Sequence, residues 1–239
     1  NFSTTMVPIS NGTSTARITY DGDADGDGVY AHITGRPFGI YLRNSGAFTT
    51  IQHFEISNCT EGIQGWAETT PLLGAKFLSN KIHGMENRGI ILIGEADTVE
   101  SPANYYDGAE IAYNEIYANG TNTIGNDIGL SRYTTNTHIH NNKLYGTESK
   151  GVDGIVFSYA GRGNIVEYNK IHDHNMTNAG EDGIDIKKAC YDTPTQNLPY
   201  NVIRYNEIYG HTRQTGITVQ FDSQYVKIYG NNIYGNMRG

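Results

Sequence analysis

One short phrase recurs seven times along the chain: an apolar residue, four further positions, and a second apolar residue. Six copies hold Asn at their fourth position, and they begin at Phe77, Ile111, Ile139, Val166, Ile203 and Ile228. The seventh, Ile51 to Ile56, has Phe54 in the Asn position. Successive copies start 25 to 37 residues apart. Such a period is typical of repeat proteins, in which each unit buries its apolar face by stacking on its neighbours.

A second phrase, Gly-Ile-x-apolar or a close variant, lies between these copies. It begins at Gly39, Gly89, Asp127, Gly154, Gly183 and Gly216, with a reduced Gly62-Ile63. Each repeat therefore has two or three short strands, and apolar residues never follow a helical period over a long window. We predict an all-β fold, a right-handed parallel β-helix of about seven to eight coils, with the Ile column inside and an Asn ladder in a turn.

We expect one β-helix domain over residues 1–239, cut from a longer chain because neither end shows a polar cap. Missing cap sequence, another domain or contacts in a homo-oligomer would cover the ends. Cys59 and Cys190 would lie about five coils apart, roughly 24 Å at ~4.8 Å per coil, and should both be free thiols.

Composition excludes several classes of function. No apolar run approaches the roughly 18 residues that a transmembrane helix needs. The formal net charge is −8 and no stretch is rich in Lys or Arg, which argues against nucleic-acid binding. An anionic ligand would have to be held by a few local cations or by a metal. Asn-x-Ser/Thr sequons permit an extracellular or cell-surface location.

Two long insertions follow the Gly-Ile strands of separate coils. Gly94 to Ala109 contains Tyr105 and Tyr106, and Lys188 to Asn201 contains Tyr191. Both leave the same corner, three coils apart, so they would form the walls of a cleft about 14 Å long, with these tyrosines as substrate-binding residues. Two unrelated surface loops are the alternative.

The strands over which this cleft would lie carry an unusual set of charges. Just before the Gly-Ile units, or within them, come Asn126 with Asp127, then Asp153, then Glu181 with Asp182; Asp185 and Lys187 follow, and Arg132 ends an earlier strand. Stacking would bring carboxylates to neighbouring rungs, where they repel one another unless a cation or a proton is required. Asp127 and Arg132 are candidate substrate contacts. Ordinary Asp-Gly turn chemistry is the alternative.

At these residues a family resemblance appears. Asp153-Gly-Ile, followed one coil later by Glu181-Asp182-Gly-Ile-Asp185, resembles the calcium site of family 9 pectate lyases, which are right-handed β-helix enzymes. The resemblance implies Ca²⁺ held by Asp153, Glu181, Asp182 and Asp185. This chain departs from the pattern at Glu181, at Ile184 and at Thr218, which stands where that family has its catalytic lysine. Lys187 is the remaining candidate base.

The chemistry leaves three functions open. β-Elimination in a uronate chain needs a neutralised carboxylate and a base for the C5 proton, which Ca²⁺ and Lys187 would supply. Hydrolysis needs two carboxyl groups, which Asp153 with Asp182 or Asp185 would supply. In this respect the chain also resembles β-helix glycoside hydrolases, among them polygalacturonases and archaeal disaggregatases. We predict an enzyme that cleaves an acidic polysaccharide, with elimination favoured; a non-catalytic carbohydrate-binding or structural solenoid is the third reading.

Two further patterns are weaker. Asp21, Asp23, Asp25 and Asp27 match half of an EF-hand-like loop, and a polar turn is preferred to structural Ca²⁺ there. One ring would stand on each of six consecutive coils, namely His83, Tyr117, Tyr145, His172, Tyr209 and Tyr234, and we expect these rings to form a stabilising ladder rather than a sugar-binding surface.

Overall fold

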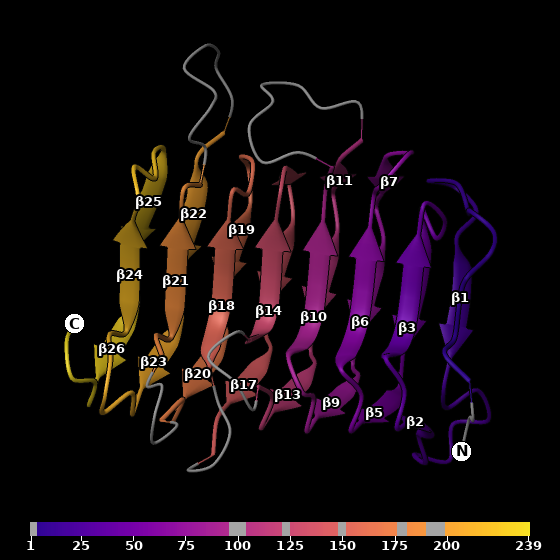
Figure 1. The fold of residues 1–239 in the computed structure, drawn as a ribbon, viewed down its shortest axis with the longest axis horizontal. Coiled ribbons are helices and arrows are strands. Elements are labelled where there is room, and N and C mark those ends of the chain that lie inside the picture. Colours follow the sequence, from indigo (N-terminus) through magenta and orange to yellow (C-terminus); the bar gives the residue numbers. More distant parts are fainter. Residues whose placement is uncertain (1–3, 96–103, 121–124, 148–151, 176–180, 190–198) are drawn as a thin grey trace.

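The computed structural model describes residues 4–95, 104–120, 125–147, 152–175, 181–189 and 199–239. These residues form a right-handed parallel β-helix, with successive coils stacked along one axis and the termini at opposite ends (Figure 1). All their strand pairs are parallel and join one coil to the next. The predicted fold and coil number are therefore confirmed. The described residues contain no helix long and apolar enough to cross a membrane.

Three long sheets run along the molecule. Sheet I consists of β1 (Ile18–Asp21), β4 (Thr49–Gln52), β8 (Lys76–Leu78), β12 (Glu110–Ala112), β16 (His138–His140), β19 (Ile165–Glu167), β22 (Asn201–Arg204) and β25 (Val226–Tyr229). Sheet II consists of β2 (Ala31–Thr34), β5 (Phe54–Ser57), β9 (Lys81–His83), β13 (Glu115–Tyr117), β17 (Lys143–Tyr145), β20 (Lys170–His172), β23 (Glu207–Tyr209) and β26 (Asn232–Tyr234).

Sheet III carries the Gly-Ile phrases and consists of β3 (Phe38–Arg43), β6 (Glu61–Trp66), β10 (Arg88–Ile93), β14 (Asn126–Ser131), β18 (Asp153–Ser158), β21 (Ile184–Lys187) and β24 (Ile217–Gln220). A short sheet IV follows it in three coils, with strands β7 (Leu72–Leu73), β11 (Tyr106–Asp107) and β15 (Thr134–Thr135).

The repeated apolar residues form the core. Ile63, Ile90, Ile128 and Ile155 occupy one register column of sheet III, and each is fully buried. Burying such a side chain contributes roughly 1.5–3 kcal/mol. No single coil can do so alone, and stacking therefore determines the architecture.

The repeated asparagines form the predicted ladder in the turn between sheets I and II. Each of the first five donates from Nδ2 to the Oδ1 of the Asn in the next coil, at 2.9–3.1 Å, in the order Asn80, Asn114, Asn142, Asn169, Asn206 and Asn231. Each amide also satisfies buried backbone groups, for example Ile111 O for Asn142. The ladder fixes the register of the coils because one Asn stands on each rung.

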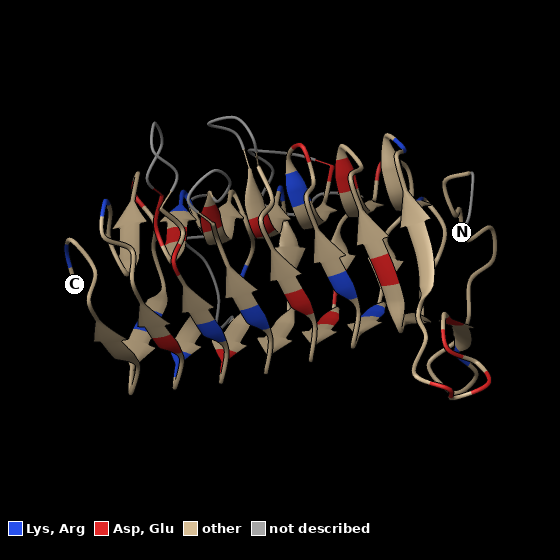
Figure 2. Ribbon diagram, turned by 90° about the horizontal axis from the view of Figure 1, so that it is seen from below, with Lys and Arg blue, Asp and Glu red and all other residues tan. Residues whose placement is uncertain are grey.

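On the outer face of sheet II, side chains of adjacent coils interact in pairs, as stacked rings or as opposite charges. The predicted ring ladder is confirmed: the six rings from His83 to Tyr234 stack at 4.8–5.2 Å between centroids, with interplanar angles of 8° or less. Beside it, acidic and basic residues alternate along much of the sheet (Figure 2). Glu55 pairs with Lys81 and Glu115 with Lys143 across adjacent coils, at 3.2 and 2.9 Å.

Sheet III departs from simple alternation where each Gly-Ile phrase begins. The Gly and the Ile both face the interior: a Cβ placed on Gly154 would lie 2.6 Å from the Cγ2 atom of Ile171, and Ile155 is fully buried. The residue before the Gly therefore faces outward. Residues three and five positions after that residue face outward as well, and these three outward columns form the surface described next.

Candidate functional site

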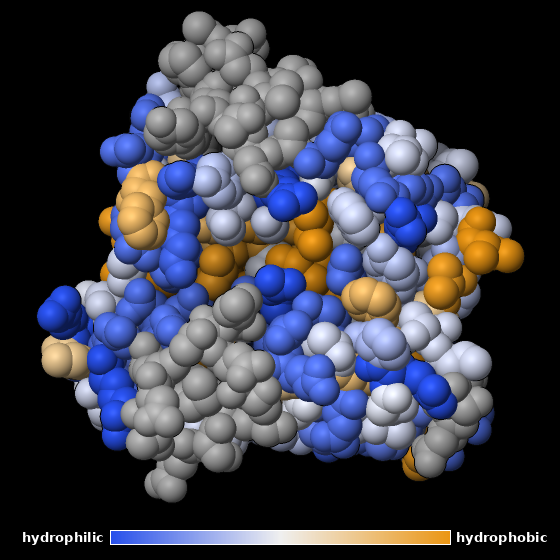
Figure 3. Space-filling view, viewed as in Figure 1, coloured by the Kyte–Doolittle hydropathy of each residue, from blue (hydrophilic) through white to orange (hydrophobic). Residues whose placement is uncertain are grey.

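The outer face of sheet III is hollowed near the middle of the molecule, with apolar groups at its floor and polar groups around it (Figure 3). Two adjoining hollows form this groove and share Arg88, Ile91 and Ser131. The first is lined by Arg88, Ile91, Gly125, Asn126, Gly129, Leu130, Ser131, Asp153, Val156, Ser158 and Lys187. The second is lined by Gln64, Trp66, Arg88, Ile91, Ile93, Ser131 and Arg132. The groove crosses β6, β10, β14, β18 and β21.

Three carboxylates meet at one end of the groove. Asp153, Asp182 and Asp185 are all buried, and one oxygen from each lies within 4.8 Å of the others. Backbone amides orient two of them: Asp182 N–H donates to Asp153 Oδ1 at 2.9 Å, and Thr215 N–H donates to Asp182 Oδ1 at 2.8 Å. Stacking of consecutive coils thus brings together the acids that the sequence placed on neighbouring rungs.

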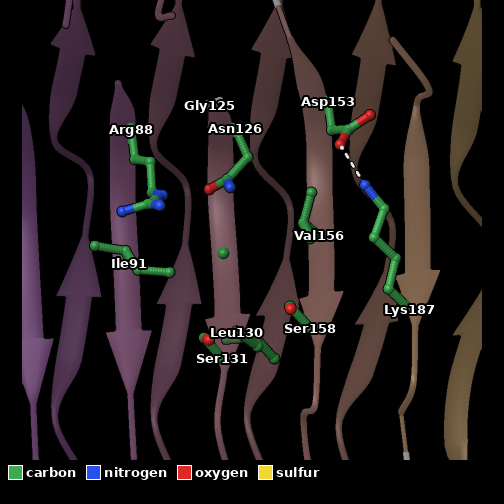
Figure 4. A pocket seen from close by; sticks show the side chains of 11 residues that line it. Arg88, Ile91, Gly125, Asn126, Leu130, Ser131, Asp153, Val156, Ser158 and Lys187 are labelled. Carbon is green, nitrogen blue, oxygen red and sulfur yellow. Dashed lines mark ion pairs between the residues drawn. The ribbon is translucent and has the colours of Figure 1, made fainter. Parts of the chain in front are cut away.

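Two side chains partly balance this acidic cluster. Lys187 Nζ lies 2.5 Å from Asp185 Oδ2 and 3.7 Å from Asp153 Oδ2 (Figure 4 shows the second pair). Gln220 Nε2 lies 2.9 and 3.0 Å from the two oxygens of Asp185. The fourth predicted acid, Glu181, is half-buried, and the charges of Lys187, Asp182 and Asp185 act on it. One ammonium therefore serves several carboxyl groups.

Burial dominates the electrostatics of the cluster. It raises the pKa of Asp153 well above the ordinary value, although Lys187 opposes this, and it raises the pKa of Asp185 and of Glu181. Burial by itself would lower the pKa of Lys187, but its bond with Asp185 and the charges of Asp153 and Glu181 raise it overall. In this arrangement the lysine is held protonated, and a proton on Asp153 is favoured.

Asp127, expected to contact substrate, faces the interior instead. It occupies the Gly position of its phrase, is 2% exposed, accepts from Asn119 Nδ2 at 2.8 Å, and lies 2.9 Å from His174 Nε2. On most other coils this position is a Gly, and a Cβ added there would touch the Cγ2 atom of an Ile. On this coil the register places Leu144 opposite Asp127, and Leu has no branch at Cβ. The outward assignment was wrong because the strand turns two consecutive residues inward here.

A chain of buried hydrogen bonds continues from Asp127. His174 Nδ1 lies 3.1 Å from His211 Nε2, and His211 Nδ1 lies 2.9 Å from Asn236 Oδ1, which also accepts from the His211 backbone N–H. Since Asn236 Oδ1 only accepts, His211 Nδ1 must donate, its Nε2 must accept, and His174 Nδ1 must donate in turn. With His174 neutral, Asp127 is the donor. Burial supports this, raising the pKa of Asp127 and lowering that of His174 to about 3.

The three tyrosines that were predicted to line the walls of the cleft differ in their positions. Tyr106 is fully buried, its ring filling the space above Gly65, so it belongs to the core and cannot contact a polysaccharide. Tyr105 is half-buried and lines neither hollow. Tyr191 and Cys190 lie outside the described residues, as does much of both insertions. Cys59 is a buried free thiol, as expected.

Arg132, a predicted substrate contact, lines the second hollow. Several residues of the site received no role from sequence reasoning, above all Arg88 and Trp66, which line the groove, and Gln220, which contacts Asp185. Their signal was their place in the outward columns of the Gly-Ile strands, but only the register across coils brings them together. Outside this groove, Asp23, Asp25 and Asp27 also gather; Asp25 and Asp27 are exposed and Asp23 is half-buried.

Solved structures of similar fold include an alginate lyase, an alginate epimerase and a tailspike protein. An alginate lyase from Paenibacillus sp. str. FPU-7 has a TM-score of 0.64 at 14% identity, covering 95% of this chain and 84% of the lyase. A mutant of the periplasmic alginate epimerase AlgG has a TM-score of 0.54 at 14% identity, covering 96% of this chain and 58% of the epimerase. The Dettilon tailspike protein has a TM-score of 0.54 at 15% identity, covering 90% and 42%. Identities this low establish the fold alone. No curated protein sequence is a significant match.

A family model described as periplasmic copper-binding protein (NosD) matches residues 21–238. Copper in proteins favours imidazole and sulfur ligands. In the described part of the chain, both groups that could hold a metal consist of Asp alone, and the rings of His174 and His211 are occupied by the buried hydrogen-bond chain. These residues do not fit copper and fit a hard, oxygen-binding cation better. By its match over residues 21–238, the chain nevertheless belongs to the NosD family.

Proposed function

We propose that this protein binds a uronate-containing polysaccharide along the groove of sheet III and cleaves it by Ca²⁺-assisted β-elimination at the acidic cluster. The observation that carries the proposal is the meeting of Asp153, Asp182 and Asp185, with oxygens within 4.8 Å of one another, at the end of an open groove. Folded proteins usually disperse like charges on adjacent strands. Retaining these charges side by side is costly unless they serve a ligand or a proton.

The donor set suits calcium. Ca²⁺ takes carboxylate and other oxygen ligands, and Asp153, Glu181, Asp182 and Asp185 would hold it. Bound there, it would neutralise the carboxylate of the sugar. Two residues of the next coil orient these acids: Gln220 contacts Asp185, and the Thr215 amide donates to Asp182. Two of the carboxylates that would hold Ca²⁺ are therefore positioned before the cation binds.

Lys187 is the proposed base for the C5 proton. Its ammonium now pairs with Asp185 and Asp153, which keeps it charged. It can accept a proton only when those carboxylates are engaged elsewhere, because they supply the attraction that raises its pKa. The lysine and the acids are therefore coupled, and catalysis should depend on the occupancy of the acidic cluster.

The relatives support this class of substrate. The similar structures include an alginate lyase and an alginate epimerase, and the NosD family is described as periplasmic. We infer that this protein also works outside the cytoplasm, on a polymer in the cell envelope or the surrounding medium. Its groove carries Arg88, Arg132 and Lys187, which suit an anionic chain even though the protein as a whole is acidic.

The test uses a panel of uronate polysaccharides, with Ca²⁺ or with a chelator, and follows ultraviolet absorbance and reducing ends in the same samples. Elimination leaves an unsaturated uronate, so both signals should rise and both should be lost on chelation. Binding without either signal would instead identify a carbohydrate-binding solenoid and refute the enzymatic proposal.

Hydrolysis is the second candidate, favoured by one observation. Burial raises the pKa of Asp153 well above its ordinary range, which is what a general acid requires. Asp182 or Asp185 would then be the partner carboxylate. Reducing ends without ultraviolet absorbance, insensitive to chelation, would establish this reaction in place of elimination.

A further inference from the structure

The hollow over Gly129 contains features that the acidic cluster does not explain. Along the outward column of sheet III that holds Ile91, Gly129, Val156 and Asp185, Gly129 has no side chain, and this absence opens the floor of the first hollow. The two flanking residues are apolar, and both are largely buried, 4% and 8% exposed. An apolar floor between polar rims suits one face of a sugar ring.

The polar rim includes an unpartnered group. Asn126 is 7% exposed and points into the hollow, and its Oδ1 has no hydrogen-bond partner among the described residues (Figure 4). An added Cβ on Gly129 would lie 2.7 Å from that oxygen, so the amide rests directly above the bare backbone. A buried amide oxygen without a partner is costly, and a hydroxyl donor from a ligand would relieve that cost.

Arg88 supplies a cation at the same place. Its side chain extends along β10 toward Ile91 and the Asn126 amide (Figure 4). Nη1 donates to Glu61 Oε1 at 3.0 Å, which uses one of five guanidinium N–H donors. Arg88 thus retains donors that can reach a carboxylate in the hollow, and guanidinium is well suited to bind a carboxylate.

We infer that the hollow over Gly129 is a subsite for one uronate residue next to the one acted on, with Arg88 binding its carboxylate, Asn126 a hydroxyl, and Ile91 and Val156 one face of its ring. This inference rests on the proposed function and deepens it. Gly129 lies two strands from Asp185, about 10 Å at ~4.8 Å per strand, so one polymer reaches both places. The enzyme then recognises the carboxylate of a sugar residue that it does not cleave.

The experiment measures binding of a uronate tetrasaccharide and of its carboxyl-reduced, neutral counterpart by calorimetry. Wild-type protein should bind the charged ligand more tightly. Arg88→Met should weaken binding of the uronate ligand at least tenfold and leave the neutral ligand within twofold. Gly129→Val, whose Cβ would meet only the flexible ends of Ile91 and Asn126, should weaken binding of both.

Arg204→Met is the matched control. Arg204 also pairs with a largely buried glutamate, Glu167, at 2.6 Å, and is similarly exposed, but it lies on sheet I. It should bind both ligands as wild type does. If Arg88→Met unfolds because Glu61 is left alone, the double variant Glu61→Gln with Arg88→Met removes that buried charge and is measured instead.

The outcomes separate the two proposals. Equal loss of both ligands in Arg88→Met, or unchanged binding in Gly129→Val, would overturn the subsite while the proposed function stands on its product assay. Failure of wild-type protein to bind either ligand would overturn the subsite and count against the polysaccharide function as well.

Discussion

The outer faces of sheets II and III are built from the same coils but treat charge in opposite ways. On sheet II, Glu55 faces Lys81 and Glu115 faces Lys143, and a ladder of rings covers the neighbouring column. On sheet III, consecutive coils place Asp153, Asp182 and Asp185 together, with Lys187 as the nearby cation. The chain is able to alternate charges between coils, and it does so on sheet III at Glu61 and Arg88, but it does not do so at the acidic cluster.

This difference separates stability from function. Charges that alternate between adjacent strands contribute a few tenths of a kcal/mol to about 1 kcal/mol each. Carboxylates that share a buried site oppose folding, because burial and mutual repulsion favour their neutral forms. The sheet that gives up stability is also the sheet with the groove, and we expect the two sheets to respond oppositely to the same kind of substitution.

The largest contrast should appear in activity. Asp153→Asn on sheet III should lower the rate of polysaccharide cleavage roughly 10²–10⁴-fold, the range for loss of a group that takes part in proton transfer or charge stabilisation. It should not lower the free energy of unfolding, because a buried carboxyl group has been replaced by a neutral one. Glu115→Gln on sheet II should keep full activity. Product assays and denaturant titrations measure both quantities, and equal activity in the two variants would remove the contrast.

The inner face of sheet III sharpens the comparison. Asp127→Leu should cost roughly 2–5 kcal/mol, because it leaves Asn119 Nδ2 and His174 Nε2 buried without partners. Asp127→Asn should be close to neutral at pH 7, since its amide oxygen can accept from Asn119 while its NH₂ donates to His174. Urea titration measures both. A large loss in the Asn variant would show that Asp127 and His174 are instead a charged pair.

The same buried chain predicts a pH dependence. His174 and His211 have pKa values of about 3 in the folded protein and about 6.5 when unfolded, so the stability that they contribute is complete above pH 6.5 and is lost as the pH falls below it. The raised pKa of Asp127 acts the other way: its contribution is greatest below about pH 3.8 and declines as the pH rises. Asp127→Asn should therefore remove the part of the decline at rising pH that Asp127 causes and leave the loss below pH 6.5 in place, which urea titration across this pH range measures.

Ca²⁺ bound at the acidic cluster should stabilise the protein, and this stabilisation should depend on carboxylates of sheet III and not on those of sheet II. At one hundred times its dissociation constant a ligand adds about 2.7 kcal/mol to the free energy of unfolding. The raised pKa values of Asp153, Asp185 and Glu181 mean that protons compete with the cation, so the Ca²⁺-induced rise in Tm should be larger at pH 8 than at pH 5. Asp182→Asn should lose this rise, and Glu115→Gln should retain it. A rise in Tm that survives Asp182→Asn would place the cation elsewhere, for example at Asp23, Asp25 and Asp27.

The smallest expected effect concerns the packing of the Asp127 side chain against Leu144. Leu144→Ile would restore the β-branch that faces Gly on other coils, and should cost about 1–3 kcal/mol by overpacking against Asp127. In Asp127→Gly protein the same change should cost much less. A double-mutant cycle by thermal unfolding measures this coupling, and additive costs would show that the two side chains do not compete for space.

Periodicity allowed the coils, the Asn ladder and the ring ladder to be predicted, because each depends on one residue type recurring once per turn. It also placed Asp153, Glu181, Asp182 and Asp185 on one end of one face. It failed for Asp127, because alternation does not reveal that two successive residues face inward. It failed for Tyr106, whose ring packs over Gly65, a contact across 41 residues of sequence. Arg88 and Asn126 acquire meaning only through the register between coils.

The Asn ladder and the shared register have a consequence for how such a protein changes over evolution. Each coil contributes one residue to a column, so a substitution in one coil alters a single rung of that column. The bare backbone at Gly129 and the carboxylate of Asp185 occupy separate coils of the same column. A substitution at one position of a column can therefore change what the groove presents at one coil without redesign of the scaffold.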